Sequence, residues 1–108
     1  MVDNDAGDSL DGGSGNDTIF GSAGGDTIDG GTNTDTLDYS GSGSGVTLTL
    51  DGSAGSGGDA AGDQATSIEV VIGSGSGDDL TGVGADETLQ GGAGSDTLDG
   101  GAGADSLD

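Results

Sequence analysis

A nine-residue repeat runs through both ends of this chain and leaves room for one buried side chain per repeat. Residues 3–38 divide into four units and residues 73–108 into four more, the last two reading GGAGSDTLD and GGAGADSLD. The eighth position is aliphatic in every unit: Leu10, Ile19, Ile28, Leu37, Leu80, Leu89, Leu98 and Leu107. An amphipathic helix buries a residue every three or four positions, so this period excludes a helix.

Each repeat predicts one very short strand and one turn. Triplets such as Thr36-Leu37-Asp38 alternate polar, apolar and polar, as a strand does when one side chain points inward. The six preceding residues form the turn, where we expect glycine at the first, second and fourth positions to supply positive φ. Asn33 replaces one fourth-position glycine, and asparagine tolerates positive φ well.

Turn, strand, turn and strand together build a flattened all-β solenoid with two repeats in each coil. Eighteen residues then advance the chain by one strand spacing of about 4.8 Å, and the inward aliphatic side chains stack into one thin core. Each turn is expected to lie over the turn two repeats away.

The charge balance opposes folding unless something outside the chain offsets it. The 108 residues include 21 acidic side chains and no Lys, Arg or His, which gives a net charge of −21 and allows no internal salt bridge. With 28 glycines and few aromatic residues, such a composition is typical of disordered segments, and a flexible tail is the alternative to a fold. Nucleic acid and anionic membranes are polyanions and are excluded as partners, because binding them requires basic side chains.

A carboxylate at the sixth position of every repeat points to a cation. These residues are Asp8, Asp17, Asp26, Asp35, Asp78, Glu87, Asp96 and Asp105. Stacking brings them together in the pairs Asp8–Asp26, Asp17–Asp35, Asp78–Asp96 and Glu87–Asp105, which repel strongly unless a cation lies between them. Two stacked turns offer six or more carboxylate and carbonyl oxygens. Calcium is favoured over magnesium because it accepts flexible, carbonyl-rich coordination.

The complete units, GGSGNDTIF, GGAGSDTLD and GGAGADSLD, match the pattern GGxGxDxUx, where U is a large aliphatic residue. This pattern resembles the RTX (repeats-in-toxin) calcium-binding nonapeptide. The resemblance covers both repeat blocks, about two thirds of the chain. It implies a right-handed parallel β-roll loaded with several calcium ions. It also implies that the sixth-position carboxylates and surrounding turn carbonyls are the ligands, the carbonyls including those of Gly13, Gly15, Gly24, Gly31, Gly92, Gly94, Gly101 and Gly103.

The same resemblance implies a function for the chain. RTX repeats are typical of Gram-negative bacterial proteins exported by type I secretion, where the repeats are disordered in the low-calcium cytosol and fold outside the cell. The expected role is a calcium-induced folding module of a secreted or cell-surface toxin, hydrolase or similar protein, whose other domains are its partners. The alternative is a calcium-stiffened structural segment of an RTX adhesin or surface-layer protein.

Residues 39–72 break the repeat but are expected to continue the roll, so that residues 1–108 form a single domain. Two strand-like runs, 46–50 and 67–72, hold most of the aliphatic residues of this insert. Asp59 and Asp63 could hold a further cation in a long turn, although a solvated loop is an equal alternative. Phe20, at a ninth position, is expected to point outward.

Several units depart from the pattern. The first unit has Asp3, Asn4 and Ala6 in place of its glycines and is expected to be a frayed cap. Ser76 and Ala85 replace the fourth-position glycine, and Glu87 is one methylene longer than aspartate. No enzymatic activity is expected, because without His, Lys, Arg and Cys the chain has no usual base to activate a hydroxyl, no basic clamp and no thiol.

Overall fold

Residues 7–108, the part of the chain that the computed structural model describes, form eleven short strands and one turn of 3₁₀ helix. Asp3, Asn4 and Ala6, where we expected a frayed cap, lie outside this part. No helix in residues 7–108 has the length and apolar character needed to cross a membrane. In chain order the elements are β1 (Ser9–Asp11), β2 (Thr18–Phe20), β3 (Thr27–Asp29), β4 (Thr36–Asp38), β5 (Thr47–Thr49), η1 (Gly58–Ala60), β6 (Gln64–Thr66), β7 (Val70–Ile72), β8 (Asp79–Thr81), β9 (Thr88–Gln90), β10 (Thr97–Asp99) and β11 (Ser106–Leu107).

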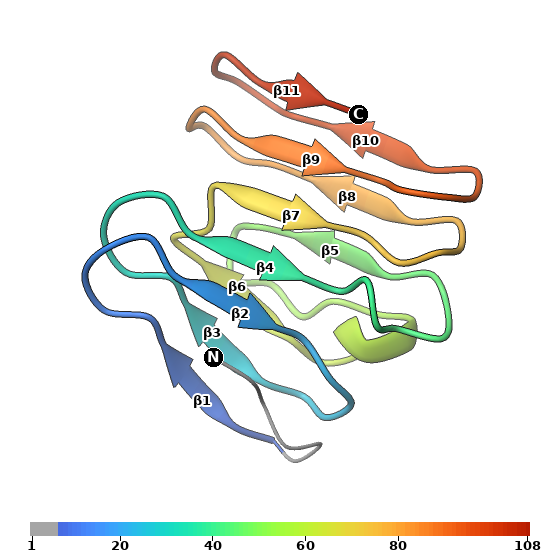
Figure 1. Cartoon of the computed structure of the whole chain (residues 1–108), viewed down its shortest axis with the longest axis horizontal. Helices are drawn as coiled ribbons and strands as arrows, with labels where there is room; N and C mark the ends of the chain where they lie inside the picture. Colours follow the sequence, from blue (N-terminus) through green and yellow to red (C-terminus); the bar gives the residue numbers. More distant parts are fainter. Residues whose placement is uncertain (1–6) are drawn as a thin grey trace.

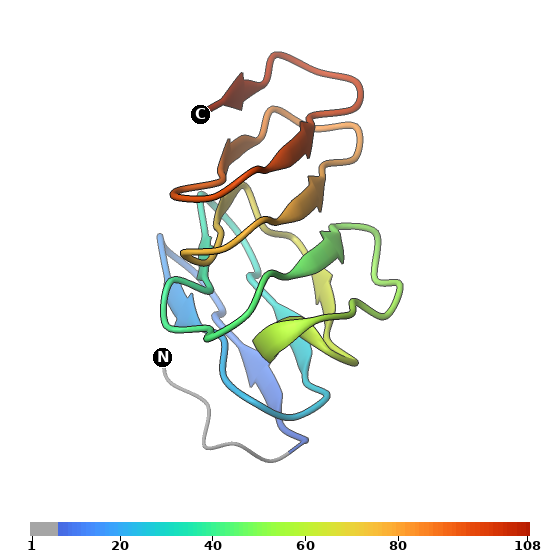
Figure 2. The same cartoon turned by 90° about the vertical axis from the view of Figure 1, so that its right-hand side faces the viewer.

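The strands stack in parallel on two opposite faces, which confirms the predicted parallel β-roll (Figures 1 and 2). One face is a five-stranded sheet in the order β11-β9-β7-β4-β2, and the other is divided into two sheets, β1-β3-β6 and β10-β8-β5. Within the repeat blocks, paired residues are eighteen apart, as Thr18 and Thr36 are in β2 and β4. Each coil of the blocks therefore contains two repeats.

The strands of the insert pair with those of the repeats. β7 lies between β4 and β9, and β6 pairs with β3, so β6 and β7 together make the third coil. β5 pairs with β8 and adds an extra strand to one face (Figure 1). The intervening residues bridge β5 to β6 through isolated antiparallel contacts, Thr47 with Ser56 and Ala54 with Gln64. Strands were expected near β5 and β7, but β6 was missed because its central residue is only alanine.

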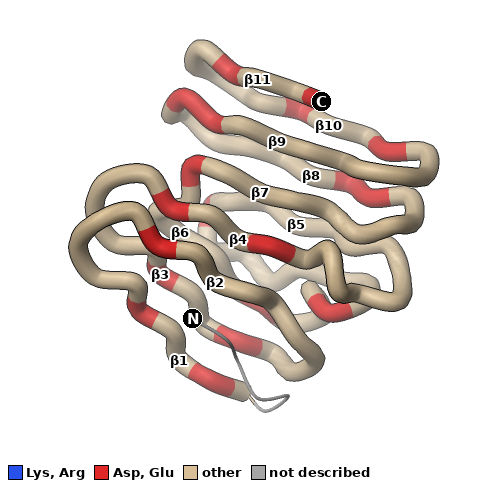
Figure 3. The backbone as a smooth tube through the Cα atoms, viewed as in Figure 1, with Lys and Arg blue, Asp and Glu red and all other residues tan. Residues whose placement is uncertain are grey.

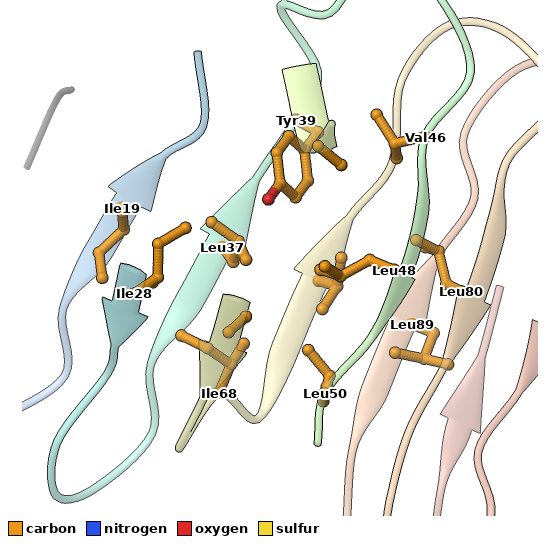
Figure 4. Packing of buried hydrophobic residues seen from close by; sticks show 13 residues of the cluster. Ile19, Ile28, Leu37, Tyr39, Val46, Leu48, Leu50, Ile68, Leu80 and Leu89 are labelled. Carbon is orange, nitrogen blue, oxygen red and sulfur yellow. The ribbon is translucent and has the colours of Figure 1, made fainter. Parts of the chain in front are cut away.

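One narrow row of aliphatic side chains forms the core (Figure 4). Strand pairing brings together Ile28 and Ala65, Leu37 and Val71, and Leu48 and Leu80, so residues of the insert continue the aliphatic column. Burial is complete in the middle of the roll and decreases at its ends, where Leu10 and Leu98 are partly buried and Leu107 is 48 % exposed. Phe20 is 43 % exposed, as expected for an outward ninth position.

Positive φ within the repeats is confined to the second and fourth positions of the turn. The residues concerned are Gly13, Gly15, Gly24, Gly31, Asn33, Gly92, Gly94, Gly101 and Gly103. Asn33, with φ of 79°, adopts the conformation expected of it. The prediction was wrong for the first-position glycines, none of which has positive φ. Their role is steric.

Replacing a central core residue is expected to cost far more than replacing a terminal one. Leu37→Ala should lower the free energy of unfolding by about 2–5 kcal/mol, because Leu37 is fully buried. Leu107→Ala deletes the same atoms at an exposed site and should change it by less than about 0.5 kcal/mol. Urea denaturation followed by circular dichroism measures both, and equal losses would contradict the assignment of the core.

Candidate metal centre

Each sixth-position carboxylate directly precedes a strand. In six of the eight repeats it lies against the glycine that opens its own repeat, whereas Gly21 lies against the Tyr39 ring. A methyl group added to Gly30 would lie 2.8 Å from Asp35 Oδ2, and one added to Gly12 would lie 2.9 Å from Asp17 Oδ2. Contacts this short leave no room for a side chain. These six glycines therefore make space for the carboxylate instead of supplying a special backbone angle.

The carboxylates stack from coil to coil through one oxygen each. The backbone N–H of Asp17 donates to Asp35 Oδ1 at 2.8 Å, across two adjacent coils. The same contact joins Asp8 to Asp26 Oδ1 (2.8 Å), Asp78 to Asp96 Oδ1 (2.9 Å) and Glu87 to Asp105 Oδ1 (3.0 Å). These are the pairs that the eighteen-residue coil predicts.

Two rows of turns, one along each side of the roll, carry these carboxylates (Figure 3). The first row, before β1, β3, β6, β5, β8 and β10, contains Asp8, Asp26, Asp63, Val46, Asp78 and Asp96. The second row, before β2, β4, β7, β9 and β11, contains Asp17, Asp35, Glu69, Glu87 and Asp105. The end members Asp8, Asp96 and Asp105 are half-buried, whereas Asp26, Asp35, Asp78 and Glu87 are buried.

Asp63 and Glu69 of the insert belong to these rows. Asp63 Oδ1 accepts the N–H of Asp26 at 2.8 Å, and Glu69 Oε2 accepts the N–H of Asp35 at 2.9 Å. Asp63 is buried and does not lie in a solvated loop, whereas Asp59 is half-buried in η1. Glu69 was not predicted from the sequence. The available signal was a carboxylate immediately before a three-residue strand, which both residues share with the regular repeats.

Buried carboxylate oxygens without a hydrogen-bond partner mark the second row. They include Asp17 Oδ2, Asp35 Oδ2 and Glu87 Oε2. Burying an ionised oxygen without a partner is costly, and this chain has no basic side chain to provide one. A hard divalent cation satisfies such an oxygen, so these residues fit a calcium site.

The pKa of the Glu87 carboxyl reflects the same cost of burying a charge. Burial raises the pKa of the Glu87 carboxyl, and the neighbouring Asp105 side chain raises it further, against hydrogen bonds from the Val83 and Ala85 backbone that lower it. A bound cation reverses this preference, because it favours the ionised carboxylate.

Backbone carbonyls must supply most of the ligands. Within residues 7–108, no three acidic side chains converge closely enough to hold a metal by themselves. All eight glycines predicted to contribute carbonyls have positive φ and lie in the turns beside the carboxylates. The Gly13 carbonyl accepts the N–H of Thr32 at 2.9 Å and, at a longer 3.5 Å, the Thr32 hydroxyl. A donor set rich in carbonyl oxygens suits calcium better than magnesium.

The departures from the repeat pattern alter two turns. Neither Ser76 nor Ala85 adopts positive φ, so the turns of residues 73–78 and 82–87 differ from the complete ones. In the first of these turns Ser74 contacts both carboxylate oxygens of Asp78, through its hydroxyl to Oδ1 at 2.7 Å and its N–H to Oδ2 at 2.9 Å. Asp78 is therefore satisfied by the protein alone.

Comparison with known protein families agrees with this chemistry. A family model described as the RTX calcium-binding nonapeptide repeat, in four copies, matches residues 3–37 and 81–108. These ranges include most of the repeat units and leave out the insert. A search of curated proteins found none that matches the chain.

The substitution Asp35→Asn is expected to weaken the cation site at Asp35 without removing the hydrogen bond from the Asp17 N–H. Asp35→Asn keeps an Oδ1 that accepts the Asp17 N–H but loses the ionised second oxygen. Loss of a charged contact worth about 1.5–3 kcal/mol should lower the calcium affinity of this site at least about tenfold. Asp79→Asn removes the same charge from an exposed strand position and is the control. Isothermal titration calorimetry measures both, and equal effects would show that only net charge matters.

Proposed function

The chain belongs to the family of RTX calcium-binding nonapeptide repeats, and we propose that it is a calcium-induced folding module of a secreted bacterial protein. The observation that carries the proposal is the set of buried second-row oxygens without a hydrogen-bond partner. RTX repeats bind calcium and are not themselves catalytic elements. The ligands that we propose are the sixth-position carboxylates with the turn carbonyls around them, except Asp78, both of whose oxygens accept hydrogen bonds from the protein. Glu69 is added to this set.

Folding and calcium binding are coupled because the ligands of one site come from stacked coils. Asp17 and Asp35 are eighteen residues apart and meet only when their coils are stacked. The net charge of −21 opposes this stacking when the cation is absent. Calcium therefore binds the folded chain and not the unfolded one, and its binding free energy becomes folding free energy.

This coupling suits export through a narrow channel. Extracellular calcium modules commonly have dissociation constants of about 0.1–1 mM, far above cytosolic calcium. With sites in this range, the chain stays unfolded inside the cell and folds as one domain outside it. RTX repeats are typical of secreted bacterial proteins, and we place this chain outside a Gram-negative cell after type I secretion. Its partners are then calcium and the other domains of a longer toxin, hydrolase or similar protein.

A second candidate is a structural segment of an RTX adhesin or surface layer. The observation in its favour is that every coil stacks along one axis, so cations bound between coils stiffen the roll in that direction (Figure 1). This function requires calcium-dependent association of the ends of the roll, whereas a folding module works as a monomer.

The folding switch is tested by far-ultraviolet circular dichroism during a calcium titration that starts in chelator. We expect a cooperative rise of β signal near millimolar calcium and none with the same concentration of magnesium. A signal that is unchanged up to 10 mM calcium, about ten times the weakest expected dissociation constant, would refute the module. Sedimentation velocity on the calcium-loaded sample distinguishes the candidates, because a structural segment forms end-to-end oligomers and a folding module does not.

A further inference from the structure

The centre of the first row differs from the rest of the roll, because protein groups occupy the places where other turns present their carboxylates to a cation. Three consecutive positions are involved: Asp63, Val46 and Asp78. All three share the stacking contact with the second row. Each differs from Asp35 in the group that satisfies or replaces the second carboxylate oxygen.

Val46 is the sixth residue of a repeat hidden in the insert. Residues 41–49 read GSGSGVTLT, and residues 73–81 read GSGSGDDLT. The Val46 N–H donates to Asp78 Oδ1 at 2.8 Å, which is the contact that stacks carboxylate residues elsewhere. Its side chain is buried in the core. The hidden repeat therefore keeps the stacking contact and replaces the carboxylate by an apolar group that cannot ligate a metal.

Asp63 keeps its carboxylate, but both of its oxygens accept hydrogen bonds. Oδ1 accepts the N–H of Asp26, and Oδ2 accepts the hydroxyl of Tyr39 at 2.6 Å. Tyr39 is fully buried, and its ring packs against Gly21, where any side chain would collide with it. A short hydrogen bond from a phenol to a buried carboxylate is strong, since one partner is charged.

Asp35 in the second row provides the direct comparison. Asp35 and Asp63 are both 0 % exposed, and each accepts a backbone N–H from the neighbouring coil through Oδ1. Their second oxygens differ: Asp35 Oδ2 has no hydrogen-bond partner, whereas Asp63 Oδ2 has the Tyr39 hydroxyl. The hydroxyl lies where a cation would otherwise satisfy the oxygen.

We propose that the central turns of the first row, those of Asp63, Val46 and Asp78, bind no cation and are held instead by Tyr39, the Val46 side chain and Ser74. This metal-free joint coincides with the place where one face of the roll divides into two sheets and β5 is inserted. It joins two calcium-loaded halves through contacts that do not depend on calcium. The proposal rests on calcium loading of the other turns, as proposed above.

The test counts the calcium ions bound by the full chain at saturation, using equilibrium dialysis and elemental analysis. Asp63→Asn and Asp35→Asn are matched variants, because both remove one charge from an equally buried position. At the lowest calcium concentration that saturates the wild type, we expect Asp63→Asn to bind as many ions as the wild type. Asp35→Asn should bind fewer, because its weakened site is then only partly filled. Loss of an ion in Asp63→Asn would overturn the metal-free joint and leave the folding module intact. A wild-type chain that binds no calcium would instead refute the folding module.

Tyr39→Phe provides a second variant if Asp63→Asn does not fold. It removes only the hydroxyl, so at saturating calcium we expect the unfolding equilibrium constant to rise at least about tenfold, as for loss of a hydrogen bond to a charged group. The ion count should stay the same, or rise by one if a cation takes the vacated place. A lower count would identify Tyr39 as a ligand and overturn the proposal.

A crystal structure of the calcium-loaded wild type tests the joint without any substitution. Anomalous difference peaks are expected along the second row. A calcium peak within about 2.6 Å of Asp63 Oδ2, the usual upper limit of a calcium–oxygen distance, would overturn the proposal. No such peak is expected between Asp63 and Val46.

Discussion

The rest of the structure depends on stacking buried carboxylates in a chain that has no positive side chain. One oxygen of most of these carboxylates accepts a backbone N–H from the neighbouring coil, as Asp35 Oδ1 does from Asp17, and this contact sets the carboxylate in place. In six repeats the first glycine is required because the carboxylate lies against it. The second oxygens of Asp35 and Glu87 are buried without a hydrogen-bond partner, which a bound cation would supply. In the first row the Tyr39 hydroxyl satisfies Asp63 Oδ2 and the Ser74 N–H satisfies Asp78 Oδ2. Sequence pattern, turn shape and calcium dependence all follow from this arrangement.

The hydrophobic core has a supporting role. One aliphatic side chain per nine residues gives a single narrow row, and burial decreases toward both ends of the roll. Such a core aligns the strands but is thin for a domain of 108 residues with a net charge of −21. The remaining stabilisation must come from the hydrogen bonds between coils and from bound cations. In the folding module that we propose, removing the cation leaves repulsion that the core is too small to offset.

Much of the repeat architecture could be predicted from the sequence, because each repeat meets the same surroundings. The eighteen-residue coil, the pairing of Asp17 with Asp35, and the positive φ of Asn33 all follow from the period and from residue preferences. The role of the first-position glycines was misjudged, because a close approach between side chain and backbone is invisible in a linear pattern. Glu69 was missed because the glycines that mark a repeat do not precede it.

By itself, the sequence determined the short strands, the turns, the coil length and the preference for a hard cation. These are local properties repeated at a fixed period, and stacking identical units leaves one self-consistent register. Only the tertiary structure decided how residues 39–72 enter the roll. β5 pairs with β8 across 32 residues, and the Tyr39 hydroxyl reaches Asp63 across 24, so no local pattern encodes either partner. Buried polar groups need hydrogen-bond partners. In a segment without repeats, these partners are the groups that the folded coils bring close to it.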